Sequence, residues 1–91
     1  MAHDKGDRIV NVACVQMRPE VGNKAKNVAR SIECIEQAVG DGAQLVVLPE
    51  LCNSGYVFEN MEEAVALSEP VPGGESCNTW SGLAAKLNVH I

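Results

Sequence analysis

The carboxylate of Glu50 follows a run of four apolar residues, 45–48, and a proline, Pro49. Such a run is typical of a short strand buried on both faces of a parallel sheet, and Pro49 ends it because proline has no backbone N–H to donate. We therefore expect Glu50 just past the carboxyl end of a strand, where open α/β sheets bind ligands. A carboxylate there can act as a general base, although a glutamate after a strand is more often a solvated loop residue.

The four cysteines, Cys14, Cys34, Cys52 and Cys77, are widely spaced, and none belongs to a C-x-x-C pair. This spacing argues against a zinc site or a thioredoxin-like motif, and we expect free thiols that behave as small buried hydrophobes. A reactive thiol at Cys52 is the alternative, but the nearby Glu50 carboxylate would raise the pKa of that thiol rather than lower it. No metal site is expected.

The elements that must position Glu50 form a strand–helix–strand unit. Residues 9–17 are the first expected strand, and Asn23 is expected to cap a helix that closes at the Gly-Asp-Gly sequence of residues 40–42. Together with the strand at 45–48 this predicts a right-handed parallel crossover. The turn after the first strand carries one glycine, Gly22, and neither a G-x-G-x-x-G fingerprint nor a Walker lysine motif is present. We therefore expect no cofactor.

The second half of the chain continues the α/β pattern. Residues 60–68 predict a short helix, residues 70–74 a rigid turn, and Ser76 is expected to cap a third helix. Trp80 lies on the apolar face of that helix and is interpreted as a core anchor. Residues 89–91 look like the opening of a third strand. Since these helices can cover only one face of a parallel sheet, we expect the chain to be the front part of a larger domain.

The charge and composition of the chain argue against some classes of binding partner. A formal net charge of −5, scattered along 91 residues, argues against nucleic-acid binding and against adsorption to anionic membranes. No apolar run reaches the length of a membrane span, and the polar start lacks the core of a signal peptide. We expect a cytoplasmic protein in which residues 1–8 are a flexible lead-in and residues 9–91 belong to one domain.

Residues 9–91 resemble the amino-terminal part of the carbon–nitrogen hydrolase family, the nitrilase superfamily. The most specific match is the Leu-Val-Val-Leu-Pro-Glu sequence that ends at Glu50, followed by Gly55 and Tyr56. Matches elsewhere support it in order and spacing: Val15-Gln16-Met17, Gly22 with Asn27, the Pro-Gly turn before Trp80, and the run at residues 83–89.

This resemblance implies an α/β fold, with the βαβ unit as the amino-terminal fragment of an α-β-β-α sandwich. It also implies hydrolysis of non-peptide C–N bonds in small amide, nitrile or carbamoyl substrates by a Glu-Lys-Cys mechanism. Glu50 aligns with the family's catalytic glutamate, whereas the lysine and the nucleophilic cysteine lie beyond Ile91 in the family's sequence. Tyr56 is a weaker candidate for substrate binding, the alternative being a turn residue packed under the loop.

Two further expectations accompany this interpretation. The complete protein is expected to form a homo-oligomer, and the 91-residue chain by itself is expected to be inactive. The alternative to a hydrolase is a non-catalytic α/β interaction module that binds a partner through its open sheet face, or the product of a decayed gene.

Overall fold

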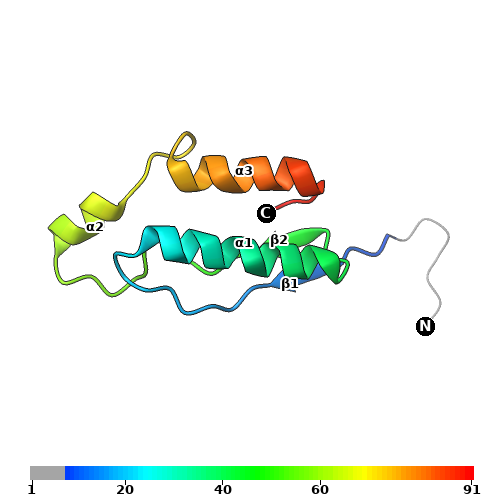
Figure 1. The fold of residues 1–91 in the computed structure, drawn as a ribbon, viewed down its shortest axis with the longest axis horizontal. Helices are drawn as coiled ribbons and strands as arrows, with labels where there is room; N and C mark the ends of the chain where they lie inside the picture. The colour runs from blue at the N-terminus through cyan, green and yellow to red at the C-terminus, as the bar shows by residue number, and fades with distance from the viewer. Residues whose placement is uncertain (1–7) are drawn as a thin grey trace.

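A computed structural model describes residues 8–91 and shows a small α/β unit (Figure 1). Nearly all of the predicted lead-in, residues 1–8, lies outside the described residues. The elements, in chain order, are β1 (Val12–Cys14), α1 (Lys24–Gly40), β2 (Leu45–Val47), α2 (Met61–Leu67) and α3 (Glu75–Leu87).

The two strands are parallel, as the crossover pattern predicts. Their register pairs Ala13 with Val46, and the ladder continues where the Val15 N–H donates to the Val47 carbonyl at 2.8 Å. The predicted first strand, residues 9–17, is too long, since only its centre finds a partner in β2.

The predicted third strand is present as a single bridge on the other edge of β2. There, His90 pairs in parallel with Leu45. The Val46 N–H donates to the His90 carbonyl at 2.8 Å, and the His90 N–H donates to the Gln44 carbonyl at 3.0 Å. β2 is therefore the central strand of this small arrangement.

The ends of α1 are those that the sequence predicts. The Asn23 side chain caps its first turn by accepting a hydrogen bond from the Lys26 N–H at 3.3 Å. At the other end Asp41 is the C-cap, and Gly42 has φ of +101°, a left-handed conformation that glycine adopts without steric cost. These caps fix where the chain turns back toward β2.

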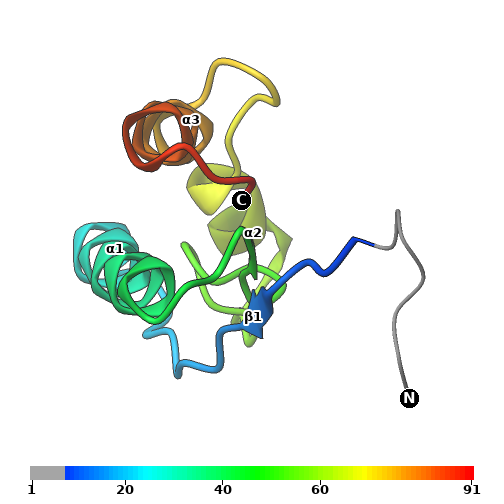
Figure 2. The same cartoon turned by 90° about the vertical axis from the view of Figure 1, so that its right-hand side faces the viewer.

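The core lies between α1, β2 and α3. Ile35, Ala43 and Val46 are buried, and α1 contacts both β2 and α3. Trp80 and Leu83 pack against this cluster from α3, which confirms the interpretation of Trp80 as an anchor. Seen along the helices, α1 and α3 lie together on one side of the strands (Figure 2).

The opposite face of the strands is open within the described residues. Along the strands burial alternates, so that Val46 is 1% exposed while Val47 is 47% exposed and Val12 is 53% exposed. The expectation that residues 45–48 are buried on both faces is therefore wrong for this part of the molecule. The expectation that its helices cover one face only is confirmed.

The short helix α2 projects at one end of the molecule (Figure 1). It begins at Asn60, whose side chain accepts from the Glu63 N–H at 2.9 Å. Met61 and Val65 are 76% and 63% exposed, so this helix adds little to the core.

The start of α3 differs from the prediction. Its N-cap is Gly74, and Ser76 lies inside the first turn, so the expected cap by the Ser76 side chain is wrong. The Glu69 carboxylate takes the capping role instead, because its Oε1 accepts from the Ser76 N–H at 2.6 Å. A carboxylate at a helix N-terminus is also favoured by the helix dipole.

Among residues 8–91, no helix combines the length and the apolar character needed to cross a bilayer.

Candidate functional site

Glu50 lies in the turn that leaves β2, as predicted, and its side chain is exposed. The turn and the residues after it, 50–55, are called the Glu50 loop. Leu51, directly after Glu50, has φ of +52°, a left-handed conformation that costs energy in a residue with a branched side chain. The amides of Ser54 and Gly55 both donate to the Leu51 carbonyl, at 3.2 and 2.9 Å, so the loop folds tightly back on itself.

A buried asparagine ties the Glu50 loop to the first turn of α1. Asn27 is 3% exposed. Its Oδ1 accepts from the Glu20 N–H at 2.8 Å, and its Nδ2 donates to the Glu20 carbonyl at 2.7 Å and to the Asn53 carbonyl at 2.9 Å. One side chain therefore joins the segment after β1, helix α1 and the Glu50 loop.

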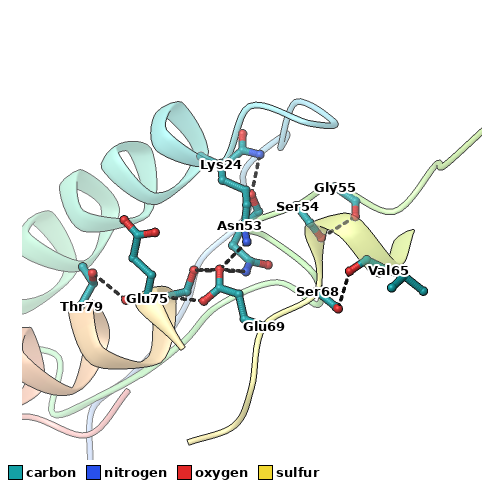
Figure 3. Close-up of polar contacts among 11 residues, drawn as sticks. Lys24, Asn53, Ser54, Gly55, Val65, Ser68, Glu69, Glu75 and Thr79 are labelled. Carbon is teal, nitrogen blue, oxygen red and sulfur yellow. Dashed lines mark hydrogen bonds and ion pairs between the residues drawn. The ribbon is translucent and has the colours of Figure 1, made fainter. Parts of the chain in front are cut away.

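A second polar cluster also holds the Glu50 loop (Figure 3). The Asn53 Nδ2 donates to Glu69 Oε2 at 3.2 Å and to Ser76 Oγ at 3.1 Å. Lys24, the first residue of α1, forms an ion pair with Glu69 at 2.7 Å, and the Ser76 hydroxyl donates to Glu69 at 2.7 Å. The cluster thus connects the starts of α1 and α3 through the loop.

The charge of Glu69 is stabilised by this cluster. Burial by itself would raise the pKa of its carboxyl, but hydrogen bonds from the Lys24 ammonium and from the amide and hydroxyl of Ser76 outweigh burial and lower the pKa to about 2. Glu69 is therefore ionised at neutral pH, and it accepts four short polar contacts in a side chain that is 12% exposed.

Gly55 marks where the Glu50 loop passes closest to the segment after β1. It has φ of +81°, and a Cβ built there would lie 2.7 Å from Val21 Cγ2 and 3.0 Å from Val21 Cα. The backbone contact is supported by a hydrogen bond from the Gly22 N–H to the Ser54 carbonyl at 3.3 Å. Both the close approach and the positive φ require glycine at this position.

Cys52 belongs to the Glu50 loop, and it is buried, with 2% of its surface exposed. Burial raises the pKa of its thiol, which keeps it protonated and unreactive. The prediction of a small buried hydrophobe is thus confirmed for Cys52, but it is wrong for Cys14, which is exposed on the open face of the sheet. All four cysteines are free thiols.

Tyr56 follows the Glu50 loop and is 58% exposed. It is therefore not packed beneath the loop, and its part in substrate binding stays a prediction. A hollow of about 350 Å³ lies beside the loop and is lined by Pro49, Leu51, Cys52 and Trp80 among others. Glu50 does not line this hollow.

Sequence reasoning located Glu50 but missed Glu69 and Asn53, which form the polar cluster that holds the Glu50 loop. A glutamate before Pro70 and an asparagine in a turn are both typical of solvated loops, so no local pattern distinguishes them. No group of three or more His, Cys, Asp or Glu residues within 8–91 is arranged to hold a metal ion.

Comparison with known proteins gives a consistent result. The family model described as carbon-nitrogen hydrolase matches residues 11–91. A nitrilase of Pyrococcus abyssi is 40% identical over 83 residues, which cover 91% of this chain and 32% of the relative. A probable nitrilase of Schizosaccharomyces pombe is 35% identical over 89% of this chain and 30% of the relative. An omega-amidase of Danio rerio is 37% identical over 75% of this chain and 23% of the relative. The chain therefore spans about a third or less of the length of these curated relatives.

Proposed function

The chain belongs to the carbon–nitrogen hydrolase family, and we propose that the complete protein hydrolyses a non-peptide C–N bond in a small amide, nitrile or carbamoyl compound. Glu50 is the general base in this proposal. The observation that supports it is the place of Glu50 three residues after the end of β2, at the carboxyl edge of the sheet, in a loop held by two polar clusters.

The proposed chemistry explains why a carboxylate is needed. A free thiol has a pKa of about 8.5, so little thiolate exists at neutral pH. In the Glu-Lys-Cys mechanism the glutamate takes the thiol proton, and the thiolate attacks the carbon of the amide or nitrile. A lysine stabilises the negative charge that develops on the substrate. With an amide, ammonia or an amine leaves, taking up the proton that the glutamate accepted from the thiol, and a thioester remains. With a nitrile, attack gives a thioimidate, which first adds one water molecule before ammonia leaves and the thioester remains. The glutamate then activates a further water molecule, which releases the acid and the free thiol from the thioester.

In this proposal none of the chain's own cysteines is the nucleophile, as the family resemblance implies. Cys52 is the nearest in sequence to Glu50, but it is buried, and its thiol pKa is raised. The proposed lysine and cysteine are those that the resemblance implies, which lie beyond the position of Ile91 in the family's sequence. The 91-residue chain alone is proposed to be inactive for the same reason.

The names of the relatives, nitrilase and omega-amidase, support a nitrile or an amide as the substrate class. Tyr56, exposed at the end of the Glu50 loop, is proposed to contact the substrate. We also propose a cytoplasmic location, on the basis of four free thiols, and a homo-oligomeric complete protein.

The second candidate is a non-catalytic module that binds a partner through its sheet. The open face of β1 and β2, with Val12 and Val47 about half exposed, favours it. The two candidates differ in a simple respect, since only the hydrolase needs the carboxylate of Glu50.

The experiment compares ammonia release by the complete protein from butyramide, butyronitrile and N-carbamoylglycine with that by Glu50→Gln. The substitution keeps the size of the side chain and removes the base, so we expect kcat to fall by about 10²–10⁴-fold or more. Glu36→Gln, a change at an exposed glutamate on α1, is the matched control and should keep full activity. Absence of ammonia release by the wild type, or more than about a tenth of its rate in Glu50→Gln, contradicts the proposal.

A further inference from the structure

The side chain and the backbone of Asn53 are both used to hold the Glu50 loop. Its carbonyl accepts from Asn27 at 2.9 Å, while its Nδ2 donates to Glu69 at 3.2 Å and to Ser76 at 3.1 Å. These contacts reach α1 on one side and the start of α3 on the other. Asn53 is three residues from Glu50, so it is close enough in the chain to fix the path of the backbone there.

Glu69 is the acceptor around which the second cluster is built. Its carboxylate oxygens accept from the Lys24 ammonium, from the amide and hydroxyl of Ser76 and from the Asn53 side chain, with every donor–acceptor distance at most 3.2 Å. Hydrogen bonds to an ionised acceptor are stronger than those between neutral groups. Gly74 leaves space for the Glu69 side chain, because a Cβ added at Gly74 would lie 2.8 Å from Glu69 Cβ and 2.9 Å from its Oε1. The cluster is thus a closely fitted arrangement.

The backbone of Leu51 has an unfavourable conformation that the surrounding contacts must maintain. A non-glycine residue at φ of +52° costs energy and persists only where its surroundings impose the conformation. Leu51 lies between Glu50 and Asn53, the loop residue whose contacts hold the loop. Release of Asn53 would let this residue relax, and the peptide that carries Glu50 would turn with it.

We propose that Asn53 and Glu69 are positioning residues for Glu50, holding its loop against the starts of α1 and α3 so that the carboxylate meets its proton donor. The inference rests on the proposed function of Glu50 as a base. Neither residue has a hydrogen bond or an ion pair with Glu50 itself, so each acts through the backbone of the loop. A misplacement of about 1 Å at a reacting group can lower the rate by about 10²-fold, so contacts that fix the loop can affect kcat strongly.

The test uses Asn53→Ala in the complete protein, because this change removes the amide donor and leaves the backbone contact with Asn27. The amide donor is also lost in Asn53→Asp, a near-isosteric change that sets a second carboxylate against Glu69. Ile35→Val, in the core away from the loop, is the control for a general loss of stability. Hydrogen exchange at the amides of Ser54 and Gly55 reports the loop directly, and steady-state kinetics with the amide or nitrile probe turned over fastest reports catalysis.

We expect faster exchange at Ser54 and Gly55 in both Asn53 variants, without faster exchange in α1. We expect kcat to fall by about 10- to 100-fold while KM changes by less than about threefold. For Asn53→Asp the loss of kcat should be smaller at acidic pH, where the new carboxyl is protonated and again donates to Glu69. Ile35→Val should keep kcat despite a lower melting temperature.

The outcomes separate this inference from the proposed function. If Glu50→Gln is inactive but Asn53→Ala keeps kcat within about twofold of the wild type, the positioning role is overturned and the base survives. It is also overturned if exchange at Ser54 and Gly55 is unchanged, or if Ile35→Val loses as much kcat as Asn53→Ala. If Glu50→Gln stays active, the proposed function fails, whatever the Asn53 variants do.

Discussion

The indole N–H of Trp80 donates a hydrogen bond to the hydroxyl of Ser31 at 2.9 Å, across 49 residues of sequence. Ser31 is fully buried, and its own hydroxyl hydrogen is directed to the Val28 carbonyl at 2.6 Å. The hydroxyl therefore accepts from α3 and donates within α1. This contact fixes how α3 is seated on α1, and with it the position of the Glu69 cluster at the start of α3.

Replacement of Trp80 by phenylalanine should remove this hydrogen bond and part of the apolar contact with the core. We expect the free energy of unfolding to fall by about 1–3 kcal/mol, because the buried Ser31 hydroxyl keeps its donor contact but loses the group that donates to it. The measurement is urea unfolding of Trp80→Phe, Ser31→Ala and the double variant. A double variant whose loss equals the sum of the two single losses would show that the indole and the hydroxyl are not coupled.

Replacement of Gly55 by alanine should lower the free energy of unfolding for two reasons, and a second variant separates them. Gly55→Ala places a Cβ 2.7 Å from Val21 and also imposes a positive φ of 81° on a non-glycine residue. Gly42→Ala imposes a positive φ of 101° at a site with nothing within 4 Å, so it carries the conformational cost alone. We expect both variants to be destabilised by about 1 kcal/mol or more, and Gly55→Ala by the larger amount. Thermal unfolding of the two proteins measures this, and equal melting temperatures would contradict the close contact.

Acid should weaken the fold through Glu69. The pKa of its carboxyl is about 2 in the folded protein against an ordinary value of 4.5. A pKa that is lowered by folding contributes stability that is fully present above the unfolded value and is lost as the pH falls through the folded one. The contribution should therefore be complete above about pH 5 and decline toward pH 2.

Melting temperatures of the wild type and Glu69→Gln over that pH range test this assignment. The glutamine variant lacks the titrating group, so its melting temperature should fall less steeply with acid. Glu62→Gln, a change at an exposed glutamate of α2, serves as the control and should follow the wild type. Parallel curves for wild type and Glu69→Gln would mean that the carboxylate does not contribute in this way.

Local chemistry allowed much of the fold to be predicted from the sequence. The apolar stripe between Asn23 and Gly42 defines α1 because the helical period and both caps are local signals. Glu50 was located because a proline after an apolar run marks a strand end. The cap of α3 was mispredicted because Ser76, a good capping residue by type, lies beside a carboxylate seven residues earlier in the chain that takes the role.

The polar clusters around the Glu50 loop depend on tertiary structure, and this explains why they were not predicted. Asn53 and Glu69 are 16 residues apart, and Lys24, the ion-pair partner of Glu69, is the first residue of α1. Only the parallel crossover and the seating of α3 on α1 bring these three together. The exposure of Val47 has the same origin, because which face of a strand is covered depends on elements elsewhere in the chain.

The 91-residue polypeptide by itself should show no amidase or nitrilase activity and should self-associate. It has the carboxylate of Glu50, but the lysine and the nucleophilic cysteine of the proposed mechanism are not among its residues, and Cys52, the cysteine nearest to Glu50 in sequence, is buried. Its association should run through the open face of the sheet, where Val12 and Val47 are about half exposed, because apolar patches beyond a few hundred Å² are rarely left in water. The bridge at His90 also leaves an edge that can pair with another chain.

Size-exclusion chromatography with light scattering measures the mass of the purified polypeptide. Val12→Lys should shift it toward the monomer, because a charged side chain on the open face opposes association. Val65→Lys adds the same charge on exposed α2, away from the strands, and should leave the association unchanged. A wild-type polypeptide that is a stable monomer with cooperative unfolding would show that the open face needs no cover. Such a self-sufficient domain would favour the non-catalytic interaction module over the hydrolase.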